Sequence, residues 1–127
     1  MIRIPVMLAL AMAATNGAGE KPTIADKGLE IPTEEIDVVK SDALNGSGAS
    51  AFRLYNYYEI VSVNREKSMY WATISAENDF PAGMYALGFK LAQEAGKESK
   101  MRARYWLKKA KNNGEPLADD VLRELDK

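Results

Sequence analysis

The 127 residues of this sequence include neither cysteine nor histidine. Without cysteine, the chain can form no disulfide, carry no thiolate nucleophile and accept no lipoprotein anchor. Without histidine, it lacks the commonest general base of enzymes and the commonest zinc ligand. Few ways remain to build a catalytic or metal centre, and we expect no cofactor.

The chain also lacks a strong excess of charge, since its formal net charge is -1. Its 46% hydrophobic and 28% charged residues are typical of a soluble globular protein, which argues against disorder and against an integral membrane protein. A length of 127 residues suits one modest domain, because domains commonly span ~100 to 200 residues.

The N-terminus has the layout of a secretory signal peptide. Arg3 precedes an apolar run over 4–14, and small and polar residues follow over 15–19. As a helix this run would measure about 16 Å, against ~30 Å for a bilayer core, so a transmembrane helix is the weaker interpretation. We expect residues 1–19 to be a signal peptide, cleaved near Gly19, that exports the protein to the periplasm. The alternative is a buried N-terminal helix of a cytoplasmic protein.

A flexible tether is expected between the signal peptide and the folded domain. Residues 20–32 hold two prolines, a glycine and mixed charges without apolar periodicity. Thr33 can cap a helix whose first turn carries Glu34 and Glu35, where negative charge suits the helix dipole. We therefore expect the folded domain to span residues 33–127.

The rest of the chain repeats with a period of 33 to 35 residues. Leu54, Leu87 and Leu122 follow this spacing, and each has a small residue four positions earlier. Trp71 and Trp106 form a second series, 35 residues apart, each preceded by tyrosine. Such a period is typical of stacked helical units.

The period predicts an all-α fold of antiparallel helical hairpins that form a short α-solenoid. One helix of each unit, helix A, carries the leucine, and the other, helix B, carries the tryptophan. After a first helix from Thr33 to Leu44, we expect helices A over 49–61, 82–95 and 117–126, helices B over 66–77 and 99–113, and turns at Asn45-Gly46, Asn78-Asp79 and Asn113-Gly114.

This pattern resembles the Sel-one-like repeat, a relative of the tetratricopeptide repeat. Leu87-Gly88 matches the Leu-Gly step of that family, and the run Arg-Ala-Arg-Tyr-Trp-Leu-Lys-Lys-Ala over 102–110 matches its second helix. The first unit departs from the family, because Tyr55 stands where glycine is usual. The resemblance covers residues 33–127 and implies stacked hairpins that bind other proteins.

The run over 51–58 resembles more narrowly the first repeat of short exported Sel-one-like proteins that accompany polymorphic-toxin loci in Gram-negative bacteria. Some relatives with this repeat act as immunity proteins. The resemblance therefore implies that the chain neutralises a toxin delivered to the periplasm.

The first helix A supplies the candidate binding groove. Positions 50, 54, 58 and 61 follow the spacing of core residues. Tyrosine and arginine are enriched at binding hot spots. The alternative is that the neighbouring tyrosines are core residues of the solenoid. The remaining candidates for the groove are Arg53, Asn56, Tyr57 and Ile60.

A second candidate surface is a basic stripe on the last helix B. Such a stripe can bind nucleic acid, anionic lipid or an acidic protein. Export and the lack of interleaved aromatic residues argue against nucleic acid. The alternative is a solvated helix face whose C-terminal lysines suit the helix dipole. The stripe recurs at spacings of three and four residues and comprises Lys97, Lys100, Arg104, Lys108 and Lys111.

No catalytic constellation accompanies these surfaces. Glu34-Glu35 and Asp119-Asp120 are adjacent pairs, whose side chains would point about 100° apart on a helix. The sequence has no nucleophile-elbow, phosphate-loop or metal-ligand spacing. We expect a non-enzymatic protein that binds another protein, most concretely an immunity protein that neutralises a toxin. The alternatives are a general periplasmic scaffold for an envelope or secretion complex and, last, an enzyme.

Overall fold

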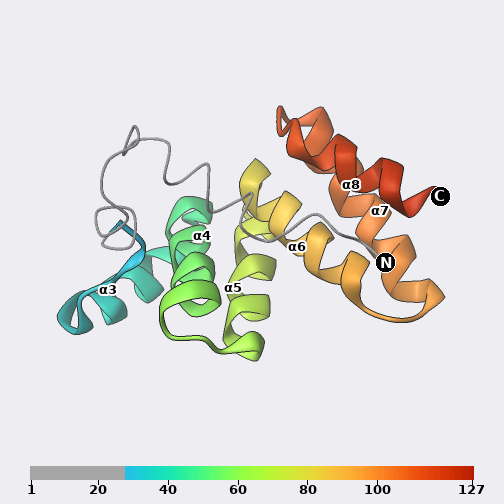
Figure 1. The fold of residues 1–127 in the computed structure, drawn as a ribbon. Coiled ribbons are helices and arrows are strands. Elements are labelled where there is room, and N and C mark those ends of the chain that lie inside the picture. The colour runs from blue at the N-terminus through green and yellow to red at the C-terminus, as the bar shows by residue number, and fades with distance from the viewer. Residues whose placement is uncertain (1–27) are drawn as a thin grey trace, which may run out of the picture.

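The computed structural model describes residues 28–127, and this part of the chain contains no β-strand. From Thr33 on, each helix packs against the next, and the helices form a stack of antiparallel hairpins (Figure 1). The predicted all-α solenoid is confirmed. Its elements are α3 (Thr33–Leu44), α4 (Gly48–Asn56), the π-helix η2 (Tyr57–Val61), α5 (Arg65–Glu77), α6 (Pro81–Gln93), α7 (Lys97–Asn112) and α8 (Leu117–Leu125).

Three equivalent turns separate the repeat units at the predicted places. The second residue of each turn has a positive φ, which is 113° at Gly46, 60° at Asp79 and 95° at Gly114. Glycine adopts this left-handed conformation freely, and aspartate tolerates it better than most residues. Each turn closes with an amide that donates to a carbonyl five residues earlier, which is the Schellman motif. The bonds are Ser47 N–Asp42 O (3.0 Å), Phe80 N–Ser75 O (3.2 Å) and Glu115 N–Ala110 O (3.0 Å).

Side-chain caps fix the start of two helices. Ser47 Oγ accepts a hydrogen bond from the Ser50 amide at the start of α4, and Asn64 Oδ1 accepts one from the Lys67 amide at the start of α5. The predicted cap by Thr33 is wrong. Helix α3 begins at Thr33 itself, after an extended Pro32, and no side chain caps it.

Glycines allow successive helices of the stack to approach closely. A Cβ added to Gly83 of α6 would lie 2.5 Å from Ser75 Cβ of α5, and one added to Gly88 would lie 2.7 Å from Leu107 Cγ of α7. Such distances leave no room for any side chain. In the first unit Gly48 makes the close approach, since a Cβ there would lie 2.7 Å from Phe80 Cβ.

Helix α6 occupies the centre of the stack. Its residues 83–92 are all buried, and it contacts the other helices A, α4 and α8, as well as its neighbours along the chain. Trp71 of α5 and Trp106 of α7 are buried as well, so both repeated tryptophans belong to the core. The three helices A therefore lie side by side, with the tryptophans packed behind them.

The packed core begins earlier than the sequence suggests. Leu29 and Ile31, which fall in the predicted tether, are buried, and Ile31 belongs to the main core cluster. The folded part of the chain therefore includes residues before Thr33. The predicted signal peptide over 1–19, and the tether up to residue 27, lie outside the described residues.

Candidate protein-binding surfaces

The candidates on α4 and η2 differ in their exposure. Arg53 is exposed, and its guanidinium lies 4.0 Å from Glu35 Oε1 of α3. Tyr57 is half-buried, with its ring 5.0 Å from that of Tyr58 in an edge-to-face contact, and Ile60 is half-buried too. Asn56 is only 6% exposed, so its prediction as a groove residue is wrong. Helices α3, α5 and α6 all contact α4. The buried face of α4 is therefore wider than a single row of residues spaced three or four apart.

The π-helix η2 changes which side chains point outward at the end of this helix. Ser62 N donates to Tyr57 O, five residues back, at 2.9 Å. A π turn holds one residue more than an α turn, so the side chains that follow it rotate away from the α-helical register. Val61, predicted in the core, is 39% exposed. The neighbouring tyrosines at 55 and 58 are buried, as the core interpretation of these residues predicted.

A nearly buried ion pair links this helix end to α6. Lys90 Nζ donates to Glu59 Oε1 at 2.8 Å, and the two side chains are 10% and 17% exposed. The ammonium group also lies 5.9 Å from the centre of the Tyr55 ring. Sequence reasoning missed this pair, because two charges 31 residues apart give no local signal.

Two buried tyrosines carry neutral hydroxyls between the helices A. Burial raises the pKa of Tyr55, and the nearby charge of Glu59 raises it further. Burial also raises the pKa of Tyr85 to about 12, with smaller contributions from Glu115 and Asp120. The Tyr85 hydroxyl is buried and has no hydrogen-bond partner among residues 28–127. Both phenols stay protonated at neutral pH, and they act as packing groups and not as bases.

Most of the basic stripe on α7 is used inside the molecule. Lys100 Nζ donates to the carbonyl oxygens of Ala92 and Glu94, at the end of α6. Arg104 donates to Leu125 O at 3.0 Å, at the end of α8, and pairs with a neighbouring aspartate. Cations at helix C-termini satisfy free carbonyls and suit the helix dipole. Lys100 and Arg104 therefore connect helix ends.

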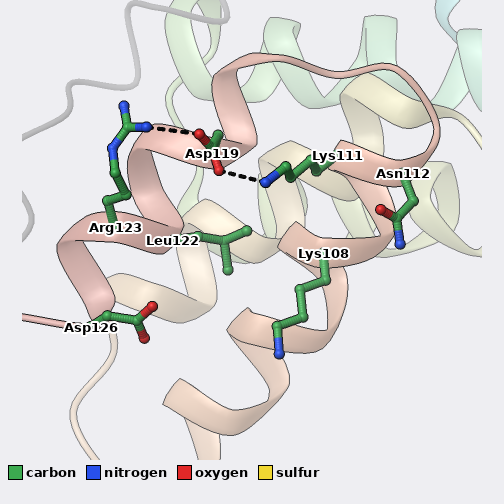
Figure 2. A pocket seen from close by; sticks show the side chains of 7 residues that line it. All are labelled: Lys108, Lys111, Asn112, Asp119, Leu122, Arg123 and Asp126. Carbon is green, nitrogen blue, oxygen red and sulfur yellow. Dashed lines mark hydrogen bonds and ion pairs between the residues drawn. The ribbon is translucent and has the colours of Figure 1, made fainter.

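A pocket of about 330 Å³ lies between α7 and α8 beside this stripe. Figure 2 shows Asp119 between two cations, Lys111 and Arg123, each 2.8 Å from one of its carboxylate oxygens. The hydrogen bond from Lys111 lowers the pKa of Asp119, and both cations add to this effect. Lys108 is exposed at the pocket and forms no ion pair within residues 28–127. The structure thus brings Lys108 and Lys111 together but leaves only Lys108 unneutralised.

Within residues 28–127, no group of acidic side chains is placed to hold a metal ion, and no helix has the length and apolarity needed to cross a bilayer. Comparison of the chain with protein-family models, curated proteins and solved structures finds no match.

Proposed function

We propose that this chain is an exported Sel-one-like repeat protein of the periplasm that binds another protein, most concretely an antibacterial toxin that acts there. The observation that carries the proposal is the stack of hairpins with its three equivalent Schellman turns. Each unit of such a stack contacts mainly its neighbours, so the stack presents an extended, fixed surface to a partner. The non-enzymatic part of the proposal rests on the composition, which lacks cysteine and histidine.

The proposed contact surface lies at the first hairpin. Arg53 is exposed, and Tyr57 and Ile60 are half-buried next to it in sequence on α4 and η2. Tyrosine and arginine supply large contact areas and directed hydrogen bonds, which is why they dominate binding hot spots. Lys108 is a second exposed cation, on a separate surface, and serves as a comparison.

Affinity capture tests the proposal. The full chain, tagged at its C-terminus and produced in a Gram-negative cell that makes the toxin, serves as bait in an envelope extract. We expect one protein to be recovered with the wild-type bait and to be depleted with a bait carrying Arg53→Glu and Tyr57→Ala. The proposal would be refuted if the wild-type bait recovered no protein above the level of an extract without bait. It would also be refuted if both baits recovered the same amount of the partner.

The alternative function is a general periplasmic scaffold, and growth distinguishes the two. An immunity protein is required only when its toxin is made. Deleting its gene should therefore kill cells that make or receive the toxin and leave other cells unaffected. A growth or envelope defect in cells without any toxin would favour the scaffold.

A further inference from the structure

Four cationic side chains from three helices surround Tyr58 at the π-helical end of α4. Lys67 Nζ of α5 lies 5.2 Å from the centre of the Tyr58 ring, and Lys40 Nζ of α3 lies 6.0 Å from it. Arg65 of α5 and Lys90 of α6 line a pocket of about 160 Å³ together with Tyr58 itself. We name these five residues the Tyr58 collar. Glu59 and Val63 complete the lining of the pocket.

The fold builds the collar at one edge of the stack. In Figure 1 the end of α4 and the start of α5 lie at the same edge, because the two helices form one antiparallel hairpin. The Glu59–Lys90 ion pair connects α6 to this edge. Tyr58 is 5% exposed, and the ammonium groups of the two lysines lie over its ring in cation–π geometry.

The collar has an excess of positive charge that the rest of the molecule does not neutralise. Lys90 is paired with Glu59. Within residues 28–127, Lys40, Arg65 and Lys67 form no ion pair, although Glu66 lies between the last two in sequence. On α7, two of the five stripe cations are neutralised, Arg104 by Asp126 and Lys111 by Asp119. The collar therefore brings three cations without an ion pair among the described residues to one buried aromatic ring and its pocket.

We propose that the Tyr58 collar docks an acidic segment of the partner, with a carboxylate binding Arg65 at the pocket, where Arg65, unpaired within residues 28–127, adds a positive charge to the neutral Glu59–Lys90 pair. A pocket of about 160 Å³ would hold about five waters at ~30 Å³ each, which is room for one carboxylate side chain. Arg65 can bind a carboxylate through two parallel hydrogen bonds, and the two lysines attract further acidic residues of the segment. That the segment belongs to a protein partner rests on the proposed function.

A nucleic acid fits the collar less well. Proteins that bind single strands offer aromatic faces on which bases stack. Here the Tyr58 side chain is buried and an ammonium group lies over its ring, so the ring offers no open face to a base.

A labelled octaglutamate peptide probes the collar without knowledge of the partner. Its binding to the full chain is followed by fluorescence polarisation at low ionic strength. Replacing Arg65 and Lys67 by glutamate together should weaken binding by about tenfold or more, since close charge pairs dominate such contacts. Both positions lie in the first turn of α5, where acidic residues suit the dipole, so the fold should be kept. Circular dichroism checks this, and the milder pair Arg65→Gln and Lys67→Gln replaces any variant that unfolds.

The matched control reverses two other exposed cations, Lys97 and Lys108, on α7. This control should change octaglutamate binding by less than about twofold. Equal weakening by the collar and control variants, no binding of octaglutamate, or tighter binding of an oligothymidylate than of octaglutamate would overturn the proposal.

The same variants separate this inference from the proposed function. If octaglutamate binds through the collar but the chain captures no protein, the acidic site stands and the proposed function fails. If a partner is captured equally by the wild-type and collar-reversed chains, the proposed function stands and the docking role of the collar is wrong.

Discussion

Substitution of Gly83 by alanine tests the close approach of α5 and α6. The added methyl group would lie 2.5 Å from Ser75 Cβ and 2.9 Å from the Ser75 carbonyl carbon, and it would also overlap Ser75 Oγ. Because one of these atoms belongs to the backbone, a change of rotamer cannot relieve the overlap. The two helices must move apart in the centre of the stack.

The expected loss of stability follows from three contributions. Overpacking of a core costs ~1 to 3 kcal/mol. Displacing Ser75 Oγ also breaks its buried hydrogen bond to Gly48 O, which is 2.8 Å long, at a cost of about 1 kcal/mol. Alanine regains ~1 kcal/mol in helix propensity over glycine. We therefore expect a net loss of about 2 kcal/mol, or a fall in Tm of roughly 10 °C for a folded part of this size.

Urea titration followed by tryptophan fluorescence measures the change, because Trp71 lies one turn before Ser75 on α5. Gly28→Ala is the control, since a Cβ there meets no atom within 4 Å. In a double-mutant cycle, Gly83→Ala should cost less stability in the Ser75→Gly background than in the wild type. The coupling energy between the two substitutions should be at least about 1 kcal/mol. If Gly83→Ala is as stable as the wild type, or the coupling is zero, the packing described for α5 and α6 is wrong.

Three further predictions concern the core. Trp106→Ala should cost about 3 to 5 kcal/mol in urea melts, as truncation of a buried aromatic does, and no measurable loss would place the side chain on the surface. Tyr85→Phe should stabilise the fold by ~1 kcal/mol or more, because it removes a buried hydroxyl without a partner; a loss would show that the hydroxyl is bonded. The raised pKa of Tyr85 means that the unfolded chain loses this proton first, so wild-type stability should fall between pH 10 and about 12, and Tyr85→Phe should reduce that slope. Glu59→Gln should cost ~1 to 3 kcal/mol by leaving Lys90 charged and unpaired, whereas Glu59→Leu with Lys90→Met should be close to neutral; equal losses would refute the pairing.

Much of the fold is predictable because the repeat leaves local signals. The leucines at 54, 87 and 122 and the Asn-Gly or Asn-Asp turns fix the helices from α4 to α8 to within about two residues. The repeated position of the tryptophans in helices B predicts that they are buried, since a large aromatic residue at such a position commonly packs in the core.

The features that escaped prediction depend on more than local periodicity. Leu29 and Ile31 stand among charged residues and next to Pro32, in a segment without a sustained apolar period, so the local pattern does not mark them as core. The π turn inserts one residue into a helix, and the 3.6-residue period then misplaces Val61. In both cases tertiary packing decides what the local pattern cannot.

The candidate surfaces were predictable only in part. The spacing of the stripe correctly places its cations on one helix, α7, but the ion pairs of Arg104 and Lys111 depend on how the last hairpin closes. The collar gathers residues from α3, η2, α5 and α6, which are distant in sequence. Binding by Arg53, Tyr57, Ile60 and Lys108 stays a prediction.

Calorimetric titration of the captured partner tests most directly whether the first hairpin of this stack binds a protein. The account predicts saturable binding that Arg53→Glu or Tyr57→Ala weakens by about 2 kcal/mol, with the helical circular dichroism of each variant retained. Lys108→Glu should leave the affinity nearly unchanged and alter mainly the association rate and its salt dependence. Unchanged affinity for both α4 and η2 variants, with binding abolished by Lys108→Glu, would contradict the account and move the site to α7.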